Sequence, residues 1–165
     1  MKVFSFVAAA SNSGKTTLIE SVVRILKAKG LRVAVIKHAS KGFDLLQPQA
    51  NAYLKSGAES VIVSGLHMAV LLRHVEAWPS MEDLQRDIGD VDVTLYEGFK
   101  ADARNKIEVF RLGVSGSRPF CVDDPSYLAL ATDTKYDVAI PQVGLNDAES
   151  VAEFILAKWK QKSAS

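Results

Sequence analysis

The chain has 165 residues, enough for one domain with a substantial buried core, and it is 48% hydrophobic and 24% charged. Its formal net charge of +1 gives no electrostatic reason to expect nucleic acid or a membrane as a partner. No apolar run approaches the roughly 20 residues of a membrane span, and the pattern at the start of the chain leads us to expect no signal peptide. The single cysteine, Cys121, excludes an intramolecular disulfide framework, and we interpret it as a small apolar residue rather than a reactive thiol. We therefore expect a cytoplasmic protein that forms a single domain over residues 1–165.

Strands and helices alternate along the chain, as judged from the spacing of apolar residues. Short apolar runs predict strands at 2–8, 31–36, 61–63, 68–72, 91–96, 107–110, 128–131 and 138–140, and the run at 31–36 is rich in β-branched residues. Segments with one apolar face predict helices at 15–29, 49–56 and 147–160. Ser80 is expected to cap a further short helix. This alternation predicts a three-layer α/β domain with a mainly parallel sheet, which binds ligands at the carboxyl ends of its strands.

The segment 9–17, Ala-Ala-Ser-Asn-Ser-Gly-Lys-Thr-Thr, joins the first predicted strand to the first predicted helix. A strand, a loop of small residues and a helix follow one another in the order of a phosphate-binding P-loop. Small residues let backbone N–H groups surround phosphate oxygens, and the helix adds its positive dipole end. We therefore expect a P-loop NTPase fold. The residues predicted to bind nucleotide in this loop are Ser11, Asn12, Ser13, Gly14, Lys15, Thr16 and Thr17.

Two side chains of the loop have distinct expected roles. The ammonium group of Lys15 would reach the terminal phosphates, and the hydroxyl group of Thr16 would take one Mg²⁺ position. One position departs from the usual motif, because Ala9 stands where a P-loop normally begins with glycine. Either the first turn avoids a backbone angle that only glycine adopts readily, or Ala9 is strained.

A P-loop also needs a carboxylate near Mg²⁺, at the end of a strand parallel to the one that precedes the loop. The predicted strand 91–96 offers Asp92 near its start and Glu97 directly after its end. Asp92 is at the wrong end of this strand, so we predict that Glu97 is the acid of the metal site. The adjoining Gly98 would let the backbone pass close to the phosphates.

Four blocks of the sequence together resemble one protein family. They are the loop 9–17, Val-Ile-Lys-His at 35–38, Tyr-Glu-Gly-Phe-Lys at 96–100 and Lys-Ile-Glu-Val at 106–109. In combination they resemble the molybdopterin-guanine dinucleotide biosynthesis adapter proteins (the MobB family), and the resemblance covers nearly the whole chain. An alanine in place of the first glycine of the loop is also similar to the pattern of this family.

The resemblance implies a homodimeric protein that binds GTP and Mg²⁺. It implies an accessory role beside the molybdenum cofactor guanylyltransferase, which joins GMP to molybdopterin, and at most a weak GTPase activity. By this similarity Lys15 and Thr16 carry the phosphate and Mg²⁺ roles, and Glu97 carries the acidic role. Molybdopterin itself is a further candidate ligand.

The segment 39–52 departs from the family pattern. Asp44 is kept, but Leu46 stands in place of a second acid, and residues 49–52 replace a Gly-Lys-Asp-Ser block. The resemblance places these positions near the γ-phosphate and the metal. We therefore expect nucleotide binding to be retained more readily than hydrolysis.

Two positions are candidates for reading the guanine base. The segment 134–137, Thr-Lys-Tyr-Asp, looks like the guanine-reading pattern of GTPases, in which Asp137 would accept two hydrogen bonds from the base. Asp133, at the end of the predicted strand 128–131, is an equal candidate. The competing interpretation of both is a polar surface turn.

Two other classes of function stay open. A small-molecule kinase or a ligase-type enzyme that uses ATP would need a lid with paired arginines, and the sequence has no Arg-rich segment. A non-hydrolysing interaction module would use the nucleotide only to fix a dimer.

Overall fold

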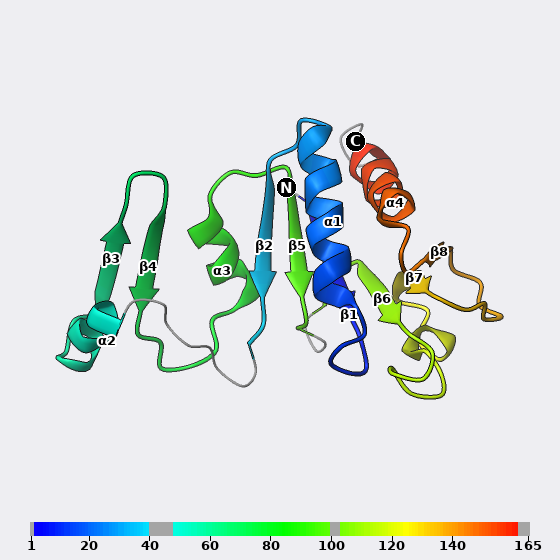
Figure 1. Cartoon of the computed structure of the whole chain (residues 1–165), viewed down its shortest axis with the longest axis horizontal. Coiled ribbons are helices and arrows are strands. Elements are labelled where there is room, and N and C mark those ends of the chain that lie inside the picture. Colours follow the sequence, from blue (N-terminus) through cyan, green and yellow to red (C-terminus); the bar gives the residue numbers. More distant parts are fainter. Residues whose placement is uncertain (1, 40–47, 100–102, 162–165) are drawn as a thin grey trace. The chain divides into compact units, whose positions relative to one another are not determined.

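The computed structural model describes residues 2–39, 48–99 and 103–161 (Figure 1). Asp44, Leu46 and the lysine at position 100 lie outside these described residues. The chain divides into two compact units, which are unit 1 (residues 1–38 and 86–165) and unit 2 (residues 39–85). That the two form one domain stays a prediction. Among the described helices, none has both the length and the apolar character needed to cross a membrane.

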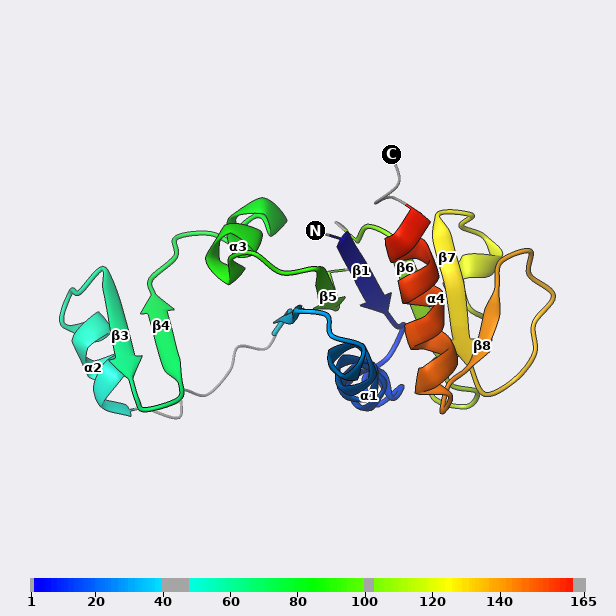
Figure 2. The same cartoon turned by 90° about the horizontal axis from the view of Figure 1, so that it is seen from above.

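Unit 1 is built on a six-stranded sheet with the strand order β2-β5-β1-β6-β7-β8 (Figures 1 and 2). The strands are β1 (Lys2–Val7), β2 (Val33–Lys37), β5 (Val93–Glu97), β6 (Lys106–Phe110), β7 (Tyr127–Thr132) and β8 (Gln142–Gly144). Every pairing in this sheet is parallel. The predicted α/β class with a mainly parallel sheet is therefore confirmed.

Two helices, α1 (Lys15–Ala28) and α4 (Ala148–Gln161), lie side by side on one face of this sheet (Figures 1 and 2). They cover alternate strand residues such as Phe4, Phe6 and Leu95, which are at most 1% exposed. The residues of α1 buried against this face are Leu18, Ile19, Val22 and Leu26. Strand side chains that are not part of this core contribute to a second buried cluster. This cluster also includes a residue of the short 3-10 helix η1 (Phe120–Val122). We call it the second cluster, and its residues are Val7, Phe110, Cys121, Tyr127 and Leu130.

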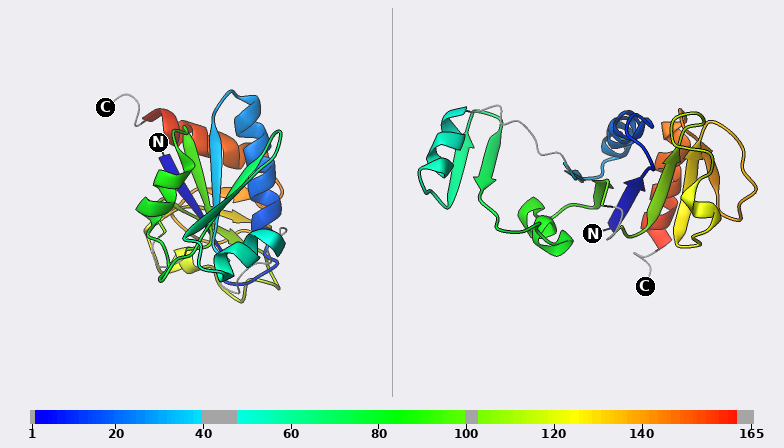
Figure 3. Two further views of the ribbon diagram at one scale, coloured as in Figure 1. Left: turned by 90° about the vertical axis from the view of Figure 1, so that its left-hand side faces the viewer. Right: turned by 90° about the horizontal axis from the view of Figure 1, so that it is seen from below.

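Unit 2 contains α2 (Pro48–Lys55) and an antiparallel hairpin of β3 (Ser60–Ser64) and β4 (Ala69–Arg73). Figure 3 shows α2 beside this hairpin. The predicted pair of adjacent strands is therefore confirmed. The helix α3 (Met81–Ile88) crosses the boundary between the units. Its start is capped by Ser80, as predicted, because the Ser80 hydroxyl oxygen accepts the N–H of Asp83 over 3.1 Å.

The last predicted strand is wrong in its position. The sequence pattern predicts a strand at 138–140, whereas the strand β8 lies after this segment. The apolar side chains of Val138 and Ile140 pack against the second cluster, and these residues do not belong to a strand of the sheet. Pro141 has no N–H to donate, but its carbonyl accepts the N–H of Leu130 over 2.9 Å, and the ladder with β7 follows from there.

Candidate nucleotide-binding site

The predicted phosphate loop connects β1 to α1, and β1 lies in the middle of the sheet between β5 and β6. The first helical hydrogen bond of α1 runs from the N–H of Leu18 to the carbonyl of Gly14 over 3.0 Å. No side chain of the described residues caps this end, and the first turn holds no acid. The start of α1 therefore directs the N–H groups of its first turn and its positive dipole end toward a bound anion.

Backbone angles settle the question raised by Ala9. Among the described residues, positive φ angles outside glycine occur at Asn12 (62°), Phe99 (56°) and Asn105 (50°), and not at Ala9. The loop instead enters the left-handed region at Asn12, a residue type that tolerates it, and at Gly14, with φ 93°. The first turn thus avoids the backbone angle that would require glycine at position 9.

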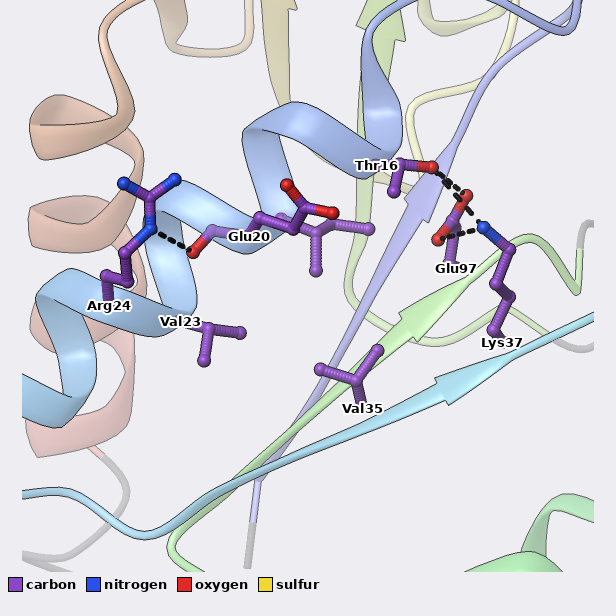
Figure 4. A pocket seen from close by; sticks show the side chains of 8 residues that line it. Thr16, Glu20, Val23, Arg24, Val35, Lys37 and Glu97 are labelled. Atoms are coloured by element: carbon purple, nitrogen blue, oxygen red, sulfur yellow. Dashed lines mark hydrogen bonds and ion pairs between the residues drawn. The ribbon is translucent and has the colours of Figure 1, made fainter. Parts of the chain in front are cut away.

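Three polar side chains from three elements meet beside the loop (Figure 4). The hydroxyl group of Thr16, in the first turn of α1, donates a hydrogen bond to Oε1 of Glu97 over 2.7 Å. The Nζ atom of Lys37 lies 3.2 Å from Oε2 of Glu97 and 3.4 Å from Oγ1 of Thr16. Lys37 ends β2, Glu97 ends β5, and the two are register partners. Strand pairing and the helix start therefore bring these groups to one carboxyl edge.

Asp92 lies near the opposite end of the same sheet. Its carboxylate accepts the backbone N–H of Arg32 over 2.7 Å and a guanidinium N–H of the same residue over 3.0 Å. The guanidinium hydrogen bonds, followed by the backbone bond, hold the pKa of Asp92 below its usual value. Glu97, and not Asp92, is thus beside the loop, and its metal role stays a prediction.

Gly98 follows β5 and lies close to the ends of β1 and β2. Its N–H donates to the carbonyl of Phe6 over 3.1 Å, and its φ of 97° is left-handed. A Cβ at this position would lie 3.1 Å from Cβ of His38, whose own N–H donates to the carbonyl of Glu97 over 2.9 Å. The ring of His38 meets that of Phe99 edge-on, with centroids 4.9 Å apart. The close approach that needs glycine is therefore to His38, and closeness to phosphate stays a prediction.

A surface cavity of about 520 Å³ follows α1 and the edge strand β2 (Figure 4). Its lining mixes apolar and charged side chains, namely Thr16, Ile19, Glu20, Val23, Arg24, Val35, Lys37 and Glu97. The cluster of Thr16, Lys37 and Glu97 forms one end of it. Its volume is in the range of small-molecule sites.

The two candidates for reading the base lie in one loop. Asp133 follows β7 directly, and its Oδ1 accepts the N–H of Leu112, in the segment after β6, over 2.9 Å. Asp137 lies further along the same loop, and both residues are exposed. Asp133 is therefore at the carboxyl edge of the sheet, while Asp137 is displaced from it. Both stay predictions.

Two cations near the loop are absent from the site residues predicted above. One is Lys37. The other is Arg111, which follows β6 and places Nη2 3.1 Å from the point that a Cβ on Gly14 would occupy. The Nε atom of Arg111 is buried and has no hydrogen-bond partner among the described residues. A cation at the carboxyl end of a predicted parallel strand is the signal that could have identified both.

The parallel sheet, the strand–loop–helix with Gly-Lys-Thr and the acid on the neighbouring strand define a P-loop-like, nucleotide-binding class of protein. A family model described as molybdopterin guanine dinucleotide synthesis protein B (MobB) matches residues 3–133. The chain therefore belongs to the MobB family, and the resemblance seen in the four sequence blocks is confirmed.

Relatives and solved structures agree with this assignment. The chain is 33% identical over 165 residues to the molybdopterin-guanine dinucleotide biosynthesis adapter protein of Escherichia coli K12, covering 94% of this chain and 91% of the relative. It is 28% identical over 149 residues to the protein of that name from Haemophilus influenzae, covering 88% and 83%. A crystal structure of molybdopterin-guanine biosynthesis protein B is similar with a TM-score of 0.72 and 28% identity, covering 96% of this chain and 99% of the other. Bacillus subtilis MobB, at 20% identity and a TM-score of 0.70 over 94% and 96% of the two chains, shares the fold.

Proposed function

We propose that this chain is a GTP-binding adapter protein in the biosynthesis of molybdopterin guanine dinucleotide, with slow or no GTP hydrolysis. The similar proteins of Escherichia coli and Haemophilus influenzae carry this adapter name. The observation that carries the nucleotide part is the 2.7 Å hydrogen bond from Thr16 to Glu97. It places a hydroxyl group and a carboxylate together beside the loop, where P-loop proteins hold Mg²⁺. A protein that binds GTP must have access to the nucleotide, which is present in the cytoplasm. We therefore propose a cytoplasmic location.

We assign the phosphates to residues 11–17. Backbone N–H groups of the loop and of the first turn of α1 would surround the phosphate oxygens, aided by the helix dipole. Lys15 would neutralise the terminal phosphates. These groups would bind the nucleotide in its ground state about as tightly as in a transition state for hydrolysis. The sequence also offers no evident base that could position a water molecule. This supports binding over catalysis.

The donor set fits Mg²⁺ that arrives with a nucleotide. Thr16 and Glu97 would hold the ion through oxygen atoms, which Mg²⁺ prefers. The described part of the chain contains no group of three or more His, Cys, Asp or Glu side chains that could hold a metal ion. Phosphate oxygens and water would have to complete the coordination, as in other phosphate-dependent Mg²⁺ sites. Once bound, the ion would neutralise charge on the β- and γ-phosphates.

The proposed partners are a second copy of the chain and the guanylyltransferase, with molybdopterin as a further ligand. In the hairpin of unit 2, Ile62 and Leu71 are register partners and are 68% and 51% exposed. A two-stranded hairpin is marginally stable alone, and a partner would bury this apolar pair. This supports a homodimer, which light scattering would detect and which Ile62→Asp should weaken.

The proposal is tested by calorimetric titration of GTP into the wild type and a Lys15→Ala variant. We expect the variant to bind GTP about 10- to 100-fold more weakly, the range of a lost charge-assisted contact, with an unchanged Tm. Lys27→Ala, at the other end of the same helix, is the matched control and should bind as the wild type. Unchanged GTP affinity in Lys15→Ala would refute the loop assignment.

The base-reading residue is tested by comparing Asp133→Asn with Asp137→Asn. The variant that loses its preference for GTP over ATP identifies the carboxylate that reads guanine. Phosphate release with the guanylyltransferase present then separates a weak GTPase from a non-hydrolysing adapter. Rapid turnover of ATP with a small metabolite would instead favour a kinase or ligase.

A further inference from the structure

The ammonium group of Lys37 contacts the same two side chains that would hold Mg²⁺ (Figure 4). Its Nζ lies 3.2 Å from Oε2 of Glu97 and 3.4 Å from Oγ1 of Thr16. The hydroxyl group of Thr16 meanwhile donates to Oε1 of Glu97 over 2.7 Å. A positive charge is thus already held at the proposed ion position by the chain itself.

Glu97 needs such a charge because its side chain is only 12% exposed. A carboxylate withdrawn from water is stabilised by hydrogen-bond donors and a nearby cation. Thr16 supplies one donor, and Lys37 supplies the cation. The pairing of β2 with β5 delivers Lys37, because Lys37 and Glu97 are register partners at the ends of these strands.

Lys37 is also suited to leave this position. Its side chain is 58% exposed, and its flexible stem can carry the ammonium group into water. Water can therefore solvate the ammonium group once it leaves Glu97, which lowers the cost of exchanging this ion pair for a bound metal ion. Its compact charge would repel a divalent cation bound to the same carboxylate, so the two compete.

We propose that Lys37 is a built-in counter-cation of the Mg²⁺ site. It neutralises Glu97 and holds it beside Thr16 in the nucleotide-free protein, and it is displaced when Mg²⁺ enters with the nucleotide. This inference rests on the proposed function, which takes Thr16 and Glu97 as the residues that hold the ion. It follows that the free protein binds divalent cations weakly, because each ion must first displace an internal charge.

The test measures Mn²⁺ binding to the full chain without nucleotide, by electron paramagnetic resonance. Lys37→Met should bind Mn²⁺ about tenfold more tightly than the wild type, because one unit charge near 3 Å contributes about this factor even in water. Lys37→Arg keeps the charge and should stay within about twofold of the wild type. The exposure of Lys37 makes both variants expected to fold, which circular dichroism checks.

Arg24→Met is the matched control. It removes one positive charge from the same cavity, but the Arg24 guanidinium contacts the carbonyl of Glu20 and the hydroxyl of Ser21, and no contact with Glu97 is drawn (Figure 4). Its Mn²⁺ affinity should match that of the wild type. An equal gain in Arg24→Met would reduce the effect to general electrostatics and overturn the proposal.

Unchanged or weaker Mn²⁺ binding by Lys37→Met, or no measurable binding by any variant, would also overturn the counter-cation role. The proposed function has a separate readout, which is GTP titration of the wild type in Mg²⁺ and in excess chelator. If GTP does not bind while Lys37→Met still gains Mn²⁺ affinity, the nucleotide assignment fails and the counter-cation role stands.

Discussion

Replacing Gly14 with alanine perturbs the one glycine of the phosphate loop. Gly14 has φ 93° and ψ 5°, a left-handed conformation that costs a residue with a Cβ about 1–2 kcal/mol. The new Cβ would also lie 3.1 Å from Nη2 of Arg111, but that atom ends a flexible side chain that can yield. The backbone cost therefore dominates. If the loop relieves it by leaving its binding conformation, GTP affinity should fall about 5- to 30-fold.

Gly30→Ala is the control for this experiment. Gly30 has φ 86° at the far end of α1, and nothing lies within 4 Å of its virtual Cβ. It should lose similar stability in urea unfolding but keep its GTP affinity. Arg111→Ala added to Gly14→Ala should restore little, because the contact is the smaller cost. Wild-type GTP affinity in Gly14→Ala, or an equal loss in Gly30→Ala, would refute this reasoning.

Three further predictions concern the second cluster and its surroundings. Glu108 is fully buried and accepts hydrogen bonds from the N–H groups of Phe120 and Cys121, each over 2.8 Å. Because Glu108→Ala would leave both donors without this acceptor, it should lower the free energy of unfolding by about 2–5 kcal/mol. A urea midpoint equal to that of the wild type would contradict this. Burial, followed by the charge of Glu108, raises the pKa of Cys121 to about 12, so the folded protein should resist iodoacetamide at neutral pH, and rapid labelling would count against it. The hydrogen bond from Lys106 is the main cause that lowers the pKa of Asp124 to about 2. The ionised Asp124 therefore stabilises the folded protein fully at pH values above its unfolded pKa near 4. This stabilisation is lost as the pH falls from there through about 2. In Lys106→Met, NMR titration should find the pKa of Asp124 moved back toward 4, and an unmoved value would show that Lys106 is not the cause.

The elements that could be predicted from the sequence are those whose own residues mark them. The apolar run before the loop and Gly30 after the helix bound β1 and α1 to within about a residue, the usual uncertainty of such boundaries. The segment 138–140 has the same apolar character but packs against the second cluster as a loop. Apolar pattern reports burial and does not distinguish a ladder from a packed loop, which is why β8 was misplaced.

The candidate site divides in the same way. The position of Glu97 was predictable, because parallel strands bring their carboxyl ends to one edge. The contact of Lys37 with Glu97 depends on the register of β2 against β5, which joins residues far apart in the sequence. The approach of Arg111 to Gly14 likewise depends on the neighbouring β1 and β6. The sequence can mark Lys37 and Arg111 as candidate cations at strand ends, but it holds no direct signal for the residues that they contact.

Nucleotide competition tests most directly whether this MobB family member is a GTP-binding protein. A fluorescent GTP analogue is bound to the wild-type chain in Mg²⁺ and displaced with unlabelled GTP or ATP. We predict that GTP displaces the analogue at concentrations at least about tenfold lower than ATP, because a carboxylate that reads guanine is left poorly paired by adenine. Equal displacement by the two nucleotides, or no binding of the analogue, would contradict the proposed function.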